Sequence, residues 1–140
     1  MDRIAHIIGT ATTNMQRRDL TIEAMSHQVV AEALAEAGLG PDQVDLVVFG
    51  NATAGRLLNQ ACIRGQSFLL DAGLRNAGII NVDNSCAGGA SALHLAALAT
   101  LGGAVHGSSV SVRQRPVGTP AAGSASSRRV NWSMGSSSVT

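Results

Sequence analysis

The sequence has 140 residues, of which 45% are hydrophobic and 2% aromatic, and its formal net charge is +1. A net charge near zero argues against a protein dedicated to nucleic acid or to a membrane surface, because both usually require a basic field. The longest apolar stretch, residues 87–101, is shorter than the roughly 20 residues that span a bilayer. The two cysteines and four histidines show no metal-ligand spacing, and no secretory leader is visible. We therefore expect one soluble, cytoplasmic domain without a metal site.

The first elements are a strand and a helix. An apolar run rich in β-branched residues, 4–8, predicts a short strand. Apolar residues then recur at helical spacing, which predicts an amphipathic helix that is capped by Asp19 or Thr21 and ended by Gly38. The apolar stripe of this helix consists of Ile22, Met25, Val29, Ala33 and Ala37.

The pattern continues with two strands and two helices. Residues 44–49 read as a buried strand, 60–71 as a weaker helix and 79–82 as a third strand. Residues 87–101 predict a helix that is apolar all round, which implies burial on every side. The order β-α-β-α-β-α indicates an α/β fold, a layered sheet with helices on its faces.

The composition changes near Gly102. Residues 1–101 contain all nine acidic residues, whereas residues 102–140 contain four arginines, ten serines and no acid. Such a segment buries too little apolar surface to offset the entropy of ordering it, so we expect a domain over 1–101 followed by a disordered tail. A shifted reading frame or a gene truncation after about Leu101 explains the change equally well.

Cys86 lies between the third strand and the first turn of the last helix. Unpaired backbone N–H groups and the helix dipole favour an anion there, so the position suits a thiolate nucleophile. Gly88 and Gly89 leave room for a substrate or another backbone to approach the sulfur. The alternative is a buried structural cysteine, since free cysteine is among the most buried residue types.

Residues 81–93, with Cys86 at their centre, resemble the nucleophile segment of the thiolases. The likeness is strongest to the branch that includes sterol-carrier and lipid-transfer-type thiolases. Further segments resemble this family in the same chain order, so that roughly residues 3–101 are covered. These segments are 7–11, 33–39 with 44–47, 50–52 and 59–65.

The resemblance implies the N-terminal half of a thiolase-like layered αβαβα fold, and acyl-thioester chemistry. In thiolases the cysteine takes an acyl group from an acyl-CoA, and either coenzyme A or a second acyl-CoA enolate then accepts it. Cys86 would be this nucleophile, and its backbone N–H would contribute to the oxyanion hole. The implied substrate is a coenzyme A thioester, with no bound cofactor. The implied partners are further copies of the chain or a thiolase-like partner chain, and Asn51 and Arg64 match positions of packing or subunit contact.

The resemblance ends after about residue 101. The second half of a thiolase supplies a Gly-His-Pro histidine as base and a Cys-x-Gly cysteine, and this sequence contains neither segment. His6 falls in a predicted strand, His27 on the polar flank of the first helix, His94 inside the apolar helix as a core residue, and His106 in the tail. We therefore expect slow acylation at best and very poor turnover by the isolated chain.

Two rival functions stay open. Residues 84–88 suit a cysteine version of the strand–nucleophile–helix elbow of α/β-hydrolases, although Asn84 stands where that elbow usually has glycine. A non-catalytic binding or assembly subunit, which pairs with a chain that carries the missing half, fits both the apolar helix and the absent base. Asp71 and Asp83 suit a helix end and a strand end better than acid–base work.

Overall fold

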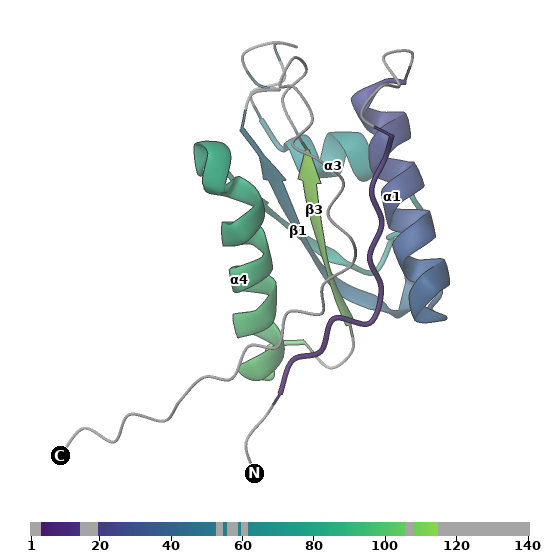
Figure 1. Cartoon of the computed structure of the whole chain (residues 1–140), viewed down its shortest axis with the longest axis vertical. Helices are drawn as coiled ribbons and strands as arrows, with labels where there is room; N and C mark the ends of the chain where they lie inside the picture. Colours follow the sequence, from purple (N-terminus) through teal and green to yellow (C-terminus); the bar gives the residue numbers. More distant parts are fainter. Residues whose placement is uncertain are drawn as a thin grey trace, which may run out of the picture.

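The computed structural model of the protein describes residues 4–14, 20–52, 55, 59, 62–105 and 108–114. Its centre is a parallel three-stranded sheet with the order β2-β1-β3. Helices α1 and α3 cover one face of this sheet and α4 covers the other (Figure 1). The strands are β1 (Val44–Asn51), β2 (Gly78–Val82) and β3 (Ser108–Gln114), and the helices are α1 (Ile22–Ala37), α3 (Arg64–Leu69) and α4 (Gly88–Leu101).

The first predicted helix is confirmed, with Thr21 as its cap and Gly38 at its end, whereas Asp19, the alternative cap, lies outside the described residues. The Thr21 side chain accepts a hydrogen bond from the Ala24 N–H at 3.1 Å, and Gly38 ends α1 in the left-handed conformation with φ 69°. The buried row, however, consists of Ser26, Val30 and Leu34 rather than the predicted stripe. Burial of Ser26 is tolerated because its hydroxyl donates to the Ile22 carbonyl within the helix.

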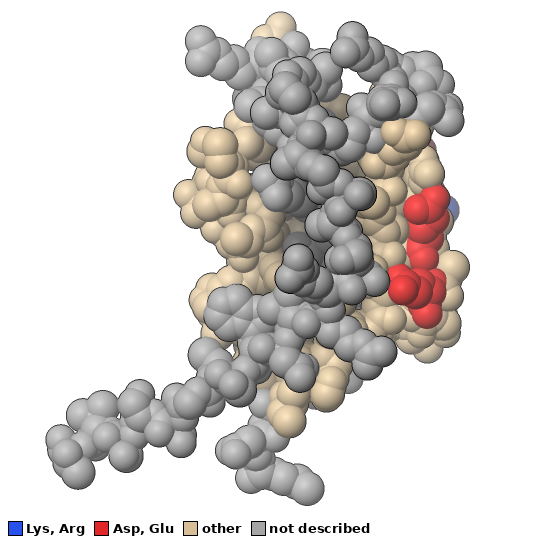
Figure 2. Space-filling model, viewed as in Figure 1, with Lys and Arg blue, Asp and Glu red and all other residues tan. Residues whose placement is uncertain are grey.

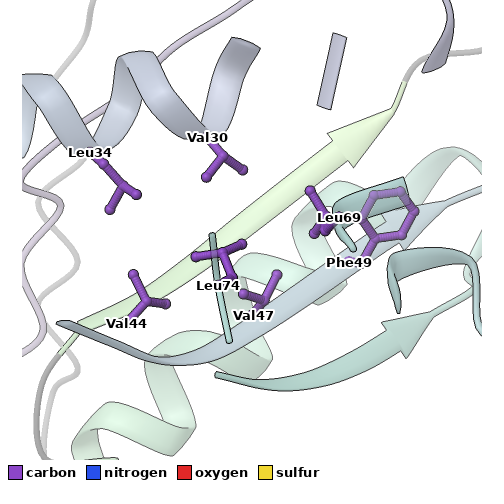
Figure 3. Packing of buried hydrophobic residues seen from close by; sticks show 7 residues of the cluster. All are labelled: Val30, Leu34, Val44, Val47, Phe49, Leu69 and Leu74. Carbon is purple, nitrogen blue, oxygen red and sulfur yellow. The ribbon is translucent and has the colours of Figure 1, made fainter. Parts of the chain in front are cut away.

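Strand β1 is buried along its whole length apart from Asp45. An irregular register between Val44 and Leu46 precedes the regular alternation of side chains along the strand. Val47 and Phe49 pack toward α1 and α3, and the Phe49 ring contacts Phe68 at a centroid distance of 5.9 Å. The residues of this larger core are Val30, Leu34, Val44, Val47, Phe49, Leu69 and Leu74 (Figure 3).

The N-terminal run 4–8 is not a strand, contrary to the sequence prediction. Ile4, Ile7 and Ile8 are 68%, 53% and 57% exposed. Both edges of the central strand β1 are taken by β2 and β3, and residues 4–8 join the outer edge of neither of these strands, so their β-branched composition alone does not make a strand. The segment that follows rests on α1 instead, where the Thr10 backbone N–H donates to the Glu36 carboxylate at 2.6 Å.

Residues 108–114 differ from the expected disordered tail. They form β3, which pairs in parallel with β1 over Val44–Asn51. Val110 and Val112 alternate with serines, which is a strand pattern that the overall composition of the tail obscures. The rest of the predicted tail, 115–140, lies outside the described residues.

Helix α4 is confirmed, but its predicted burial on every side is wrong. Gly88, Ala92 and Ala96 are buried, whereas Leu93 and Leu98 are 43% and 44% exposed. The sheet covers only one side of α4, and the described residues leave Leu93 and Leu98 exposed to solvent. His94 is exposed as well, rather than a core residue.

The second predicted helix is shorter than its pattern suggested. Helix α3 ends at Leu69, and Leu70 and Asp71 belong to the following turn, where Gly73 has φ 80°. The predicted start, residues 60 and 61, lies outside the described residues.

Candidate functional site

Cys86 lies where the carboxyl ends of β1 and β2 meet the start of α4. The two strands run parallel, with Gly50 opposite Val82 at their ends. Residues 83–87, here named the Cys86 turn, connect β2 to α4 and include a short 3₁₀ helix, η2 (Ser85–Ala87). This is the location that the sequence predicts. Cys86 is exposed, which argues against the alternative of a buried structural cysteine.

The backbone of the Cys86 turn is strained next to the cysteine. Ser85 has φ 44°, in the left-handed region that costs a residue other than glycine about 1–2 kcal/mol. Such a conformation persists only where the surroundings hold it in place. The Ser85 hydroxyl also lies 3.9 Å from the Cys86 sulfur, as a weak hydrogen-bond donor.

Two side-chain contacts hold the Cys86 turn from opposite sides. The Asn84 amide donates to the Ser91 hydroxyl in α4 at 2.8 Å. The Arg64 guanidinium, at the start of α3, donates to the Asp83 carboxylate at 2.8 Å. Sequence reasoning placed Arg64 in packing or subunit contact and Asp83 at a strand end. It missed their pairing, because 19 residues separate them and only the packing of α3 beside β2 brings them together.

A polar network fixes the start of α3 on β2. The Asn81 side chain accepts from the Gly65 N–H at 2.6 Å and donates to the Gln66 side chain at 2.7 Å. The Gln66 amide in turn donates to the Ile79 carbonyl at 3.2 Å. A Cβ at Gly65 would lie 2.8 Å from Phe49 and Ile79 atoms, so only glycine allows this close approach.

Gly88 and Gly89 differ in their surroundings. Gly88 is buried, and a Cβ at Gly50 would lie 2.9 Å from the Gly88 carbonyl oxygen. Glycine at position 50 is therefore what allows the end of β1 to approach the first turn of α4, whereas a Cβ at Gly88 would meet no atom closer than the Asn51 nitrogen at 4.0 Å. Gly89 is half-buried. Substrate contact by these two glycines stays a prediction.

The histidines do not assemble into the site that the structure describes. His27 lies on α1, which covers the opposite face of the sheet from α4, and within the described part its Nε2 is buried without a hydrogen-bond partner. His94 is exposed further along α4, His6 is exposed near the N-terminus, and His106 lies outside the described residues. Cys62, the second cysteine, is exposed just before α3.

The described residues contain no group of three or more His, Cys, Asp and Glu side chains arranged to hold a metal ion. Across the same ranges, no helix combines the length and the apolar character that crossing a bilayer demands.

These features define an α/β domain that presents an exposed cysteine at a strand–helix junction. The family model for the thiolase N-terminal domain matches residues 5–106. The chain belongs to the thiolase family, a family of acyltransferase-type enzymes, and corresponds to its N-terminal domain. The resemblance seen in the sequence and the α/β fold class that it implied are thereby confirmed.

Individual relatives agree with this assignment. The chain is 30% identical over 98 residues to the benzoylsuccinyl-CoA thiolase subunit BbsB of Thauera aromatica, covering 69% of this chain and 24% of that protein. Among solved structures it is similar to the priming β-ketosynthase of the R1128 polyketide biosynthetic pathway. That similarity has a TM-score of 0.50 and 31% identity, and covers 69% of this chain and 28% of the other. The chain thus spans about a quarter of the length of these relatives.

Proposed function

We propose that this chain is the nucleophile-bearing part of an acyl-CoA acyltransferase of the thiolase type, with Cys86 as the acyl acceptor. The observation that carries the proposal is an exposed cysteine in a held, strained turn at the start of α4, in a chain of the thiolase family. The relative from Thauera aromatica is named for a coenzyme A thioester, which supports this class of substrate. Coenzyme A enters the proposal as part of the substrate, and no bound cofactor is required.

The proposed chemistry is a transfer between two sulfur atoms. The Cys86 thiolate attacks the thioester carbonyl carbon, and a tetrahedral oxyanion forms. The bond from this carbon to the coenzyme A sulfur then breaks, which leaves an acyl thioester on Cys86 and releases coenzyme A as a thiolate that takes up a proton. We assign the Cys86 backbone N–H to the oxyanion, because donors at a helix start favour negative charge there.

A complete cycle requires more than this step. A base must take up the Cys86 proton, and a further acid–base group must serve the second substrate, in either thiolysis or Claisen condensation. The thiolase resemblance assigns both groups to the second half of the enzyme. We therefore expect the isolated chain to accept one acyl group slowly and to turn over very poorly.

Acylation of the purified chain by acetyl-CoA tests the proposal. We expect intact mass spectrometry to show one added acetyl group, peptide mapping to place it on Cys86, and neutral hydroxylamine to remove it. The Cys62→Ser variant should be acylated equally and the Cys86→Ser variant should not. Iodoacetamide near neutral pH should label Cys86 well ahead of Cys62. Equal, slow labelling of both cysteines without an acetyl adduct would contradict the proposal.

A second candidate function is an assembly subunit that pairs with a thiolase-like chain. The exposed leucines Leu93 and Leu98 on α4 favour it, because an apolar face that nothing covers in the described residues is typical of an interaction surface. Co-purification with such a chain, retained by the Cys86→Ser variant, would support this function. A monomer that binds no such chain would count against it.

A further inference from the structure

The ion pair between Arg64 and Asp83 links α3 to the Cys86 turn. The Arg64 side chain is only 13% exposed, and its Nη2 lies 2.8 Å from the Asp83 carboxylate, which is 53% exposed. A guanidinium that is so far removed from water is stable only beside a compensating acceptor. Arg64 and Asp83 are therefore held together more firmly than a pair of which both members are exposed.

The backbone at Arg64 is held in place on the sheet. Arg64 is the first residue of α3, and the next two residues are bound to β2 through the network of Gly65, Gln66 and Asn81. Gly65 is also packed so closely on the sheet that the start of α3 has no room to move toward it. The position of Asp83 is therefore set relative to the sheet.

Asp83 in turn stands three residues before Cys86, with the strained Ser85 between them. Strand β2 is paired with β1 as far as Val82, and this pairing does not extend to Asp83 or to the residues that follow it in the Cys86 turn. If Asp83 is released, Ser85 can leave its left-handed conformation, and the sulfur of Cys86 then changes direction. The Asn84–Ser91 contact restrains the other side of the turn, and does so from α4.

We propose that Arg64 and Asp83 are positioning residues for acyl transfer to Cys86. The inference rests on the proposed function, because it assigns to the ion pair a role in the step that Cys86 performs. Displacement of a reacting atom by about 1 Å can cost up to about 100-fold in rate, and we expect a loss of about tenfold here. A small alkylating reagent accepts many directions of approach, so its reaction with Cys86 should change much less.

The experiment compares two probes on the whole 140-residue chain. Acetyl-CoA reports directed acyl transfer, and iodoacetamide reports the general reactivity of the thiol. In Arg64→Gln we expect acetylation to fall about tenfold, and alkylation of Cys86 to change less than about twofold. Arg64→Lys keeps the charge and should restore part of the acetylation rate. Arg75→Gln, at an exposed arginine in the turn that follows α3, should match the wild-type protein in both reactions.

Circular dichroism and urea unfolding test whether each variant is folded. Should Arg64→Gln fail to fold, Asp83→Asn removes the same ion pair at an exposed, isosteric position, and we expect the same selective loss. Unchanged acetylation in both variants would overturn the inference while the proposed function stands. An equal fall in both reactions would also overturn it, because a general loosening would then explain the loss. A wild-type chain that acquires no acetyl group would overturn the proposed function, and this inference with it.

Discussion

The two faces of the sheet are built in different ways. On the face of α1 and α3, large side chains such as Phe49 and Leu69 are almost completely buried, and the outer side of α1 carries the acidic residues that gather in Figure 2. On the face of α4, the contact with the sheet is made largely by alanine and glycine, and α4 contains no charged residue. The face of α1 and α3 is a closely packed core, and the outer side of α1 is charged. On the second face, which bears Cys86, the small residues of α4 pack against Leu46 and Val48, and leucines on the outer side of the helix are exposed. Exposed apolar side chains of this kind are typical of a surface that another protein segment covers.

The largest effect is expected when a side chain is truncated in the closely packed core beneath α1 and α3. Phe49 is 1% exposed and contacts Phe68, so Phe49→Ala should lower the free energy of unfolding by about 3–5 kcal/mol. Urea unfolding followed by circular dichroism measures this change. A loss below about 1 kcal/mol would show that the face of α1 and α3 is packed no better than the other.

A smaller effect is expected where α4 meets β1. In Gly50→Ala the added methyl group would stand 2.9 Å from the Gly88 carbonyl oxygen, a backbone atom that moves only with the helix. We expect a destabilisation of about 1–3 kcal/mol, together with slower acetylation of Cys86. Gly78→Ala is the matched control, because its methyl group would meet the nearest atom at 3.8 Å. Equal behaviour of the two variants would contradict the close approach of α4 to β1.

The Asn84–Ser91 contact is expected to contribute less to the free energy of unfolding. Asn84→Ala removes a hydrogen bond of 2.8 Å between partly exposed groups, so the free energy of unfolding should fall by about 0.5–1.5 kcal/mol. Ser91→Ala should have a similar effect, and the double variant should cost little more than either single change. Full additivity in urea unfolding would show that the two side chains do not interact.

The smallest change in stability is expected on the outer side of α4. Leu98 is 44% exposed, so Leu98→Gln should alter the free energy of unfolding by no more than about 0.5 kcal/mol. The same variant should reduce self-association, measured by sedimentation velocity. A large destabilisation of the monomer would instead mean that this leucine already belongs to a core.

Local sequence predicts some elements of this fold well. The cap at Thr21, the stop at Gly38 and the apolar run at 44–49 are local signals, and the structure agrees with each of them. The position of Cys86 between a strand and a helix follows from the same kind of pattern.

Other features depend on neighbours that are distant in sequence. Residues 4–8 have the composition of a strand but no free edge of β1 to join, whereas 108–114 occupy such an edge despite their serines. The apolar sequence pattern of α4 does not indicate how many sides of the helix are covered by other elements. The pairing of Arg64 with Asp83 requires the packing of α3 beside β2, which neither segment encodes alone.

The place of β3 has a consequence for the order in which the chain folds. Strand β1 is made early in synthesis, but one of its two edges is closed by β3, where Ser111 lies opposite Val48. Until residue 114 has left the ribosome, the Val47-Val48-Phe49 segment presents an open apolar edge, the kind of template on which other strands assemble. Nascent chains should therefore depend on chaperones most strongly while residues 52–114 are being made, and that dependence should decline once β3 is in place.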